Sequence, residues 1–360
     1  MTRRGLGGRQ KGGMAVRSMA MKIAVLAPAW FPVPPMRYGG IEWVVAILAD
    51  GLVELGHEVT LFASGDSQTK ARLVTSYDES PSMHIGLSLP DLHHALVCYE
   101  YAAEFDVIND HSGPLAAALG PVVKTPVCHT THGPMTGEAG NVYALIGEIC
   151  SSVGLISVSD SQRDPLPDLP WIATCHNAIA LESYPFDPSD DGYLLFLGRM
   201  APDKGAHHAV RLAQQTGLPL KLAGKMHDVA ERQHFEAEIR PHLNGQIEYV
   251  GEVSHDEKVD LLQRAKATVF PIQWPEPFGL VMVESMACGT PVIATRFGAV
   301  PEVIEQGRSG VIVDRPDQLA GAVEQVAALD PREVRASAEE RFSAQRMVAD
   351  YVAAYQRMLA

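Results

Sequence analysis

The sequence has few cysteines, and their arrangement excludes two kinds of structural support. There are five in 360 residues, an odd number, and no two of them form a Cys-x-x-Cys pair. They stand at positions Cys98, Cys128, Cys150, Cys175 and Cys288. Scattered cysteines of this kind form neither a disulfide framework nor a zinc site. We therefore expect free, buried thiols in a protein of a reducing compartment.

Positive charge is also scarce. The chain has 29 lysines and arginines against 43 acidic residues, which gives a formal net charge of −14. Nucleic acids and anionic membranes both attract basic surfaces, so we expect neither as a partner. The sequence also lacks an apolar run long enough to span a bilayer and a signal peptide before Met21. These absences predict a cytoplasmic protein without integral membrane association, and they carry no signal of its oligomeric state.

The first twenty residues differ from the rest of the chain. They are rich in glycine, contain no acid, and have five basic residues: Arg3, Arg4, Arg9, Lys11 and Arg17. We expect residues 1–20 to be a disordered basic extension, with the folded chain starting at Met21.

The remaining length is natural for two domains, and 46% hydrophobic with 20% charged residues is ordinary globular composition. Short apolar runs alternate with helical patterns, as in α/β proteins with doubly wound parallel sheets. A segment rich in proline and aspartate, residues 184–192, reads as a linker. We place the boundary near residue 186, with one domain over residues 21–185 and a second over residues 186–342. Within the first domain, between its second and third predicted strands, residues 68–96 show no clear period and are expected to be irregular.

The dinucleotide fingerprint Gly-x-Gly-x-x-Gly is absent from the first βαβ unit, residues 22–62. Instead, Gly39 and Gly40 precede its helix, where they allow the backbone to approach a ligand. From the dipeptide alone, a plain turn is an equally good interpretation.

Polar residues follow several predicted strands of the first domain. Asp66, Asp110, His111 and His132 each come after an apolar run. In open parallel sheets ligands bind beyond the carboxyl ends of strands, so these side chains share one rim. His132, followed by a Gly-Pro turn, is the strongest candidate of the four, although a lone histidine is more often structural.

The second domain repeats this arrangement. Arg199 and Lys204 follow the apolar run 193–197, where two fixed cations suit the charge of a leaving diphosphate. A solvated basic loop is the alternative interpretation. Glu252 and Val253 follow the run 247–251, and we expect this turn to hold a nucleoside base through its backbone.

The most informative stretch is residues 276–294. Glu276 lies between two prolines, Gly279 opens an apolar helical run from Leu280, and Glu284 lies inside that run. Unpaired amides at the start of a helix suit a phosphate, whereas carboxylates on either side suit hydroxyl groups. Phosphate between two hydroxyl-rich groups describes a nucleotide sugar. Taken singly, each glutamate is more often an ordinary surface residue.

In its Pro-Glu-Pro-Phe-Gly-Leu context, the pair of glutamates separated by seven residues resembles the double-glutamate motif of retaining GT-B glycosyltransferases of family four. The resemblance extends over residues 21–360. The sequence is also similar to small bacterial members of this family that build antibiotic or surface oligosaccharides. It implies two Rossmann-like domains around a cleft, with a C-terminal helix, residues 343–360, that packs back on the first domain.

The resemblance also implies a role for each candidate. Glu276 contacts sugar hydroxyls, Glu284 contacts the ribose, and His132 lies beside the reacting carbon. The diphosphate is held by Gly39, Gly40, Arg199, Lys204 and the amides of Phe278, Gly279 and Leu280. Asp66, Asp110 and His111 position the acceptor.

The function expected from these residues is transfer of a hexose, with retention, from a nucleoside diphosphate sugar to a hydroxyl of a soluble sugar or natural product. UDP is favoured as the commonest donor nucleotide among relatives. No cofactor is expected, and the basic pair with the helix N-terminus replaces a metal. Two alternatives remain: an epimerase or phosphorylase of the same fold, and a non-enzymatic two-domain sugar-binding protein.

Overall fold

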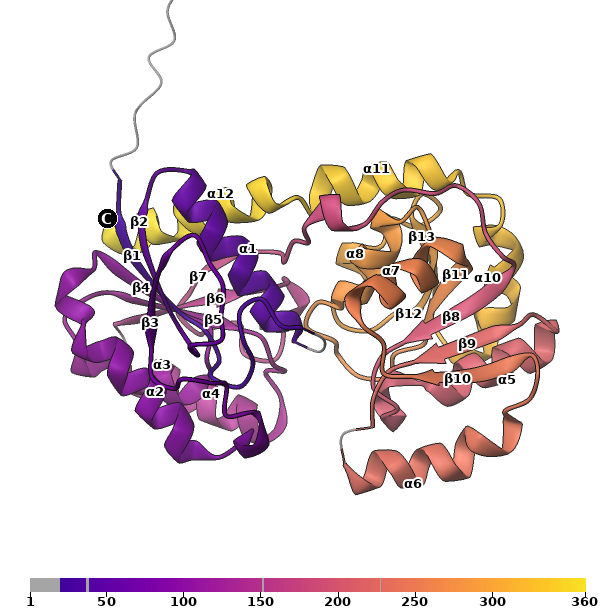
Figure 1. Cartoon of the computed structure of the whole chain (residues 1–360), viewed down its shortest axis with the longest axis horizontal. Coiled ribbons are helices and arrows are strands. Elements are labelled where there is room, and N and C mark those ends of the chain that lie inside the picture. Colours follow the sequence, from indigo (N-terminus) through magenta and orange to yellow (C-terminus); the bar gives the residue numbers. More distant parts are fainter. Residues whose placement is uncertain (1–19, 37–38, 151, 227) are drawn as a thin grey trace, which may run out of the picture.

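The computed structural model describes residues 20–36, 39–150, 152–226 and 228–360, which form two lobes lying side by side (Figure 1). The expected extension, residues 1–20, lies outside the described residues except for Ala20. Each lobe contains a parallel sheet with a hydrophobic core on both faces. This confirms the expected α/β fold with two doubly wound domains.

The first sheet has the strand order β3-β2-β1-β4-β5-β6-β7. Its strands are β1 (Lys22–Leu26), β2 (Glu58–Ala63), β3 (Arg72–Thr75), β4 (Val107–Asp110), β5 (Val127–Thr131), β6 (Val153–Ser157) and β7 (Trp171–Thr174). The helices of this lobe are α1 (Gly40–Glu54), α2 (Ser88–Glu100), α3 (Pro114–Leu119) and α4 (Gly137–Ile149). The order reverses between β1 and β4, which creates a crevice at their carboxyl ends.

The second sheet has the order β10-β9-β8-β11-β12-β13. Its strands are β8 (Tyr193–Leu197), β9 (Leu220–Ala223), β10 (Ile247–Gly251), β11 (Ala265–Phe270), β12 (Val292–Thr295) and β13 (Gly310–Val313). Its helices are α5 (Ala206–Thr216), α6 (Val229–Glu238), α7 (His255–Arg264), α8 (Leu280–Ala287), α9 (Val300–Val303), α10 (Leu319–Val326) and α11 (Pro331–Arg341). Here the order reverses between β8 and β11.

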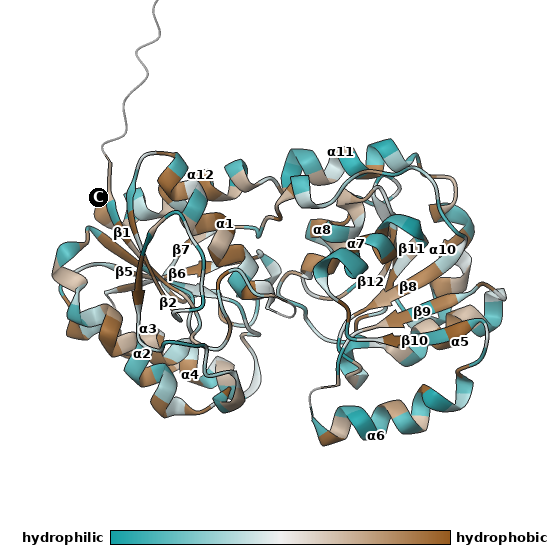
Figure 2. Ribbon diagram, viewed as in Figure 1, coloured by the Kyte–Doolittle hydropathy of each residue, from teal (hydrophilic) through white to brown (hydrophobic). Residues whose placement is uncertain are grey.

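The strands carry the hydrophobic centre of each lobe, and the helices are amphipathic covers (Figure 2). Strands β1, β4, β5, β6 and β12 are buried at nearly every position. That pattern is the one expected of parallel strands packed on both faces. All five cysteines are free and buried, as predicted.

The last helix, α12 (Ala344–Leu359), leaves the second lobe and packs on the first (Figure 1). Its buried face, which includes Met347, Tyr351 and Tyr355, joins the core formed by α1 and one face of the first sheet. The predicted return of the C-terminal helix is confirmed. Helix α12 follows α11 of the second lobe directly. The chain therefore links the second lobe to a helix that is packed into the core of the first lobe.

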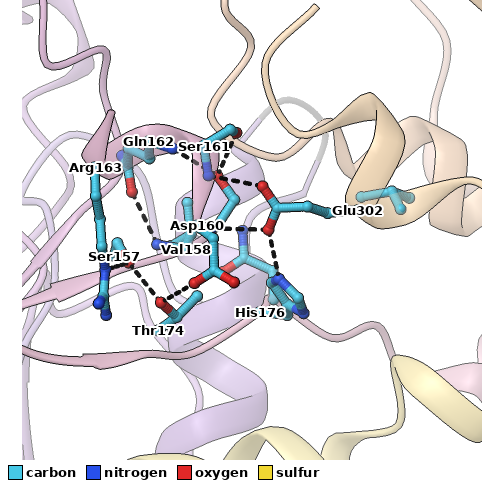
Figure 3. A network of polar contacts seen from close by, with 12 residues as sticks. Ser157, Val158, Asp160, Ser161, Gln162, Arg163, Thr174, His176 and Glu302 are labelled. Atoms are coloured by element: carbon cyan, nitrogen blue, oxygen red, sulfur yellow. Dashed lines mark hydrogen bonds and ion pairs between the residues drawn. The ribbon is translucent and has the colours of Figure 1, made fainter. Parts of the chain in front are cut away.

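A network of polar contacts between the lobes is centred on Glu302 of α9 (Figure 3). Its carboxylate accepts hydrogen bonds from the backbone amides of Asp160 at 2.8 Å and Ser161 at 2.7 Å, and it lies 3.0 Å from His176 Nε2. Burial alone would raise the pKa of Glu302, but the hydrogen bonds from His176, Ser161 and Asp160 outweigh it and lower that pKa. Glu302 is therefore held ionised between the lobes.

The expectation that residues 68–96 are irregular was wrong in part. This stretch contains β3, an edge strand, and most of α2. Strand β3 lacks a fully buried position, and α2 carries Pro90 in its first turn and the buried His94. Neither pattern gives a clear period in the sequence, because β3 is held by its pairing with β2, and α2 by its packing on the sheet.

The contact between α1 and α12 is close enough to test. A Cβ atom on Gly51 would lie 2.6 Å from Val348 Cγ2, whereas one on Gly321 of α10 would meet nothing within 4 Å. We expect Gly51→Ala to lower the free energy of unfolding by about 1–3 kcal/mol through overpacking, and Gly321→Ala to raise it by roughly 0.5–1 kcal/mol. Chemical denaturation measures both values.

The double variant Gly51→Ala/Val348→Ala should recover part of the loss, because it restores room for the new methyl group. An increase in stability for Gly51→Ala like that of Gly321→Ala would contradict this packing of α12 on α1.

Candidate active site

Two adjoining pockets lie between the lobes, at the carboxyl ends of the strands. The Glu284 pocket is lined by Tyr184, Glu252, Val253, Lys258 and Glu284, among others. The Glu276 pocket is lined by Glu42, His132, Lys204, Glu276, Phe278 and Gly279, among others. Both pockets share the lining residues Gly39, Gly40, Leu197, Gly198, Arg199, Leu280 and Val281. Together they form one cleft that contains every residue expected to bind the donor, and also His132.

The two sheets explain why these residues meet. Gly39 and Gly40 follow β1, Arg199 follows β8, and Glu276 follows β11. These are the strands beside which each sheet reverses its order, and ligands in α/β proteins bind at such points. A Cβ atom on Gly40 would lie 3.2 Å from Leu280 Cδ1, so the glycine brings the first lobe close to the start of α8.

The loop that carries Glu276 is held in place by contacts with the turn at Gly298. The amide of Ala299 donates to the Glu276 carbonyl at 3.0 Å. Gly298 has φ +53°, and a Cβ atom there would lie 2.3 Å from the same carbonyl oxygen. The side chain of Glu276 accepts a 2.5 Å hydrogen bond from Lys204 Nζ, and this ammonium lies 4.7 Å from the centre of the Trp274 ring. Lys204 and Glu276 are thus a preset ion pair.

Helix α8 begins directly beside this pair. Its N-cap, Gly279, has φ +83° and provides no side chain to cap the amides of the first turn. Residues with a side chain rarely adopt this φ, so the position favours glycine, and a Cβ atom there would also lie 2.7 Å from Met282 Cε. The uncapped helix start lines the Glu276 pocket and suits an anion.

Arg199 has a partner that sequence reasoning missed. Its guanidinium donates a short hydrogen bond to Glu231 of α6, whose side chain is 4% exposed. Asp228 caps the same helix by accepting from the Glu231 amide at 2.8 Å. An acid three residues after an N-cap aspartate marks a helix start in a sequence, but only the fold brings Glu231 to Arg199.

Glu284 is also paired in the structure. It accepts hydrogen bonds from Lys258 Nζ at 2.5 Å and from the Tyr184 hydroxyl at 2.7 Å. The sequence indicates only ligand hydroxyls as partners of this carboxylate, and sequence reasoning missed these protein partners, which come from α7 and from the linker between the lobes. Since its side chain remains 12% exposed in the pocket, it can still accept a ligand hydroxyl.

Glu42, in the first turn of α1, is a second residue that sequence reasoning missed. It is 4% exposed, lines the Glu276 pocket and comes from the first lobe. A Cβ atom on Gly39 would lie 2.8 Å from Glu42 Oε2, so the glycine makes room for this carboxyl. Burial raises its pKa from 4.5 to about 7, although its own backbone amide and the charge of Lys225 oppose the shift. A substantial fraction of Glu42 is protonated at neutral pH.

His132 lines the Glu276 pocket, as expected. Burial and the neighbouring His129 lower its pKa to about 3, so it is neutral. His111 lies behind it, with its ring centre 5.2 Å away and its plane inclined by 28° to that of His132, and is 2% exposed.

The residues expected to position the acceptor lie elsewhere. Asp110 is fully buried and paired with His129 at 2.5 Å, and Asp66 accepts hydrogen bonds from Ser80. Among the described residues that line the two pockets, Asp66, Asp110 and His111 do not occur. Asp110 and His111 support the wall of the cleft, and their expected direct contact with an acceptor is corrected accordingly.

Within the described part of the chain, no group of three or more histidine, cysteine or acidic side chains is arranged to hold a metal ion. Among those same residues, we also find no helix with the length and apolar character needed to cross a membrane.

The raised pKa of Glu42 predicts how stability depends on pH. The folded state binds the proton of this carboxyl more tightly than the unfolded state does. The stabilisation of the folded state by this proton is therefore lost as pH rises from 4.5 to about 7. Glu42→Gln keeps the shape without the charge. The free energy of unfolding of Glu42→Gln minus that of the wild type should therefore be larger at about pH 8 than at about pH 5, by roughly 1–3 kcal/mol.

Urea unfolding at the two pH values measures this difference. Glu248→Gln, at an exposed glutamate of β10, serves as the matched control and should show little change. A stability difference for Glu42→Gln that is independent of pH would contradict the burial of an uncompensated carboxyl at this position.

Comparison with known proteins agrees with this geometry. Residues 38–183 match the family described as Glycosyltransferase Family 4, and residues 185–342 match Glycosyl transferases group 1. The chain is 30% identical to the phosphatidyl-myo-inositol mannosyltransferase of Mycolicibacterium smegmatis, over 90% of this chain and 88% of that protein. It is 26% identical to a glycogen synthase of Mycobacterium tuberculosis, over 91% of each.

Solved structures share the fold. AviGT4, a glycosyltransferase involved in avilamycin A biosynthesis, has a TM-score of 0.71 at 26% identity and covers 94% of this chain and 98% of its own. HepE of Anabaena, solved with UDP and glucose, has a TM-score of 0.72 at 19% identity and covers 92% and 98%. The chain therefore belongs to the family-four glycosyltransferases of the GT-B fold.

Proposed function

We propose that this glycosyltransferase transfers a hexose, with retention of configuration, from a nucleoside diphosphate sugar to a hydroxyl of a soluble sugar or natural product. One observation carries the proposal. A single cleft joins an uncapped helix start, two basic side chains beside it, and a carboxylate on either side. This arrangement matches the order of groups in the donor, which is a nucleoside, a diphosphate and a sugar.

The proposed diphosphate site lies at the start of α8. Arg199 and Lys204 approach it from the loop after β8, and each is held by a carboxylate, Glu231 or Glu276. A diphosphate carries more charge than either carboxylate and offers several acceptor oxygens, so it competes well for both cations. Because the basic pair and the helix amides already balance its charge, we propose that the transfer requires no metal.

The remaining groups fit the two ends of the donor. Glu276, once Lys204 turns to phosphate, can accept hydrogen bonds from sugar hydroxyls in the Glu276 pocket. Glu284, fixed by Tyr184 and Lys258, can accept one from a ribose hydroxyl in the other pocket. Glu252 and Val253 line that same pocket, which supports a contact with the base edge.

For the mechanism we propose front-face attack, in which the leaving phosphate takes the proton of the acceptor hydroxyl. Double displacement requires an ionised carboxylate as nucleophile. Glu42 is a carboxyl of the first lobe in the Glu276 pocket, but its pKa of about 7 makes it a poor match for that role. In its protonated form it can donate a hydrogen bond to a substrate oxygen.

Relatives support the choice of donor and acceptor class. HepE of Anabaena was solved in complexes with UDP and with UDP-glucose, which favours UDP as the nucleotide. AviGT4 acts in avilamycin A biosynthesis, which favours a natural-product acceptor, whereas the mannosyltransferase of Mycolicibacterium smegmatis is named for a phosphatidylinositol. The net charge of −14 also favours an acceptor away from anionic lipid.

A thermal-shift screen with UDP, GDP, ADP and TDP tests the donor site. A ligand that binds only the folded state at about 100 times its Kd adds about 2.7 kcal/mol of stability, so we expect UDP to raise Tm by several degrees. Arg199→Ala should abolish most of this shift. Each protein is compared with its own ligand-free Tm, because Arg199 also neutralises the buried Glu231. A shift of unchanged size in the variant would contradict a diphosphate site at Arg199.

Replacing Glu276 tests its role with the sugar. We expect Glu276→Ala to lower kcat by about a hundredfold or more, the scale of losing a contact made to the transition state. Circular dichroism should show an intact fold, and Glu248→Ala, at an exposed site, should retain normal turnover. Near-normal turnover of Glu276→Ala would overturn the assignment.

A further inference from the structure

A chain of buried polar groups runs from the last helix to His132. His132 Nε2 lies 2.9 Å from His111 Nδ1, and His111 Nε2 lies 2.9 Å from Asn109 Oδ1. The hydroxyl of Tyr355, on α12, donates to the same Asn109 oxygen at 2.6 Å. Asn109 and Tyr355 are fully buried, and only His132 reaches the cleft.

The direction of every hydrogen bond in this chain follows from one backbone carbonyl. Asn109 Nδ2 donates to the Cys128 carbonyl oxygen at 3.1 Å and to Thr130 Oγ1 at 3.1 Å. A carbonyl oxygen can only accept, so the amide nitrogen of Asn109 must face it. The amide oxygen of Asn109 therefore faces His111 and Tyr355, and His111 must carry a proton on Nε2.

His111 carries only that proton. Burial, with the nearby His132 and His129, lowers its pKa well below the ordinary value, which keeps the ring neutral. Its Nδ1 consequently accepts the hydrogen bond from His132, whose proton lies on Nε2. The reverse arrangement would set two acceptors, His111 Nε2 and Asn109 Oδ1, 2.9 Å apart without a proton between them.

We propose that Asn109 is a positioning residue that, through His111, holds neutral His132 as the tautomer with a lone pair on Nδ1, ready to accept a hydrogen bond from a substrate hydroxyl in the cleft. The tautomer follows from these contacts together with the neutral state of His111, whereas its use toward a hydroxyl rests on the proposed function. Tyr355 steadies the Asn109 oxygen, so the returning helix α12 also supports the histidine of the cleft.

The alternative tautomer would give the site the opposite chemistry. With the proton on Nδ1, His132 would offer a donor to the cleft, and a substrate hydroxyl would have to accept it. The orientation of one buried amide thus determines whether this histidine accepts or donates. That is a stronger requirement than packing, because leucine has the same branched shape as asparagine but fixes no proton.

The test is a long-range ¹H–¹⁵N NMR measurement on protein labelled with ¹⁵N-histidine and free of substrate. In the wild type at about neutral pH, we expect His132 to be neutral, with a protonated Nε2 and an unprotonated Nδ1. Asn109→Leu should give a mixture of tautomers at His132. Tyr355→Phe should shift the populations less, and Tyr99→Phe, which removes a buried hydroxyl bonded to Ala116, should leave them unchanged.

In activity measurements, Asn109→Leu should lower kcat by about tenfold or more while the thermal shift produced by UDP stays within about twofold of the wild-type value. A loss that is merely structural would lower both. His132 charged or protonated on Nδ1 in the wild type would overturn the proposal, and so would an unchanged tautomer in folded Asn109→Leu.

If Asn109→Leu fails to fold, the wild-type tautomer alone confirms or overturns the positioning role. The tautomer is measured without substrate, so its result does not depend on the proposed function. A wild type that transfers no sugar would contradict the proposed function and would leave the tautomer result unchanged.

Discussion

Three basic side chains of the cleft, Arg199, Lys204 and Lys258, are each held by a carboxylate, and this pairing controls what the site can bind. The pairs hold the cations at the cleft, and an anion that binds at the start of α8 must draw Arg199 and Lys204 away from their carboxylates. Glu276 can then accept hydrogen bonds from hydroxyl groups, and Glu284 can do so while it stays paired with Lys258. A ligand that combines a diphosphate with two polyols therefore uses both the cations and the carboxylates of the cleft, whereas a simple anion or a simple sugar uses only one kind of group.

The pairs depend on where the two sheets bring their loops. Arg199 and Glu276 lie beyond neighbouring strands, β8 and β11, at the point where the second sheet reverses its order. The first lobe supplies Gly39, Glu42 and His132 to the opposite wall. Helix α12 joins the two hydrophobic cores in sequence, and through Tyr355 and Asn109 it also reaches the back of His132. Packing of the returning helix and the state of the cleft histidine are therefore connected.

The fold and the cleft could be predicted largely from local sequence. Short apolar runs indicate the strands of both sheets except the edge strand β3, and the stretch from Glu276 to Glu284 marks the start of α8. The donor-binding candidates each follow a strand or open a helix, which are positions that the sequence marks. The roles of these residues toward a sugar remain predictions.

Partners distant in sequence could not be predicted. Glu231 and Lys258 meet Arg199 and Glu284 only because the second sheet brings their helices to one edge. Glu42 resembles any acid in a first helical turn, and nothing in the local sequence marks it as buried. Asp110 and His111 follow a strand as ligand-binding residues do, but both are buried, Asp110 against His129 and His111 against Tyr351 of α12. The sequence contains no local signal that distinguishes a buried residue at the end of a strand from one that faces the cleft.

The most direct test of the account is a crystal structure of the protein with UDP. We expect the diphosphate at the start of α8, within hydrogen-bond distance of the first-turn amides, with Arg199 and Lys204 turned toward it and the ribose at Glu284. Glu231 and Glu276 should then have exchanged their cations for other partners. UDP bound outside the two pockets, or bound while both ion pairs stay intact, would contradict the account.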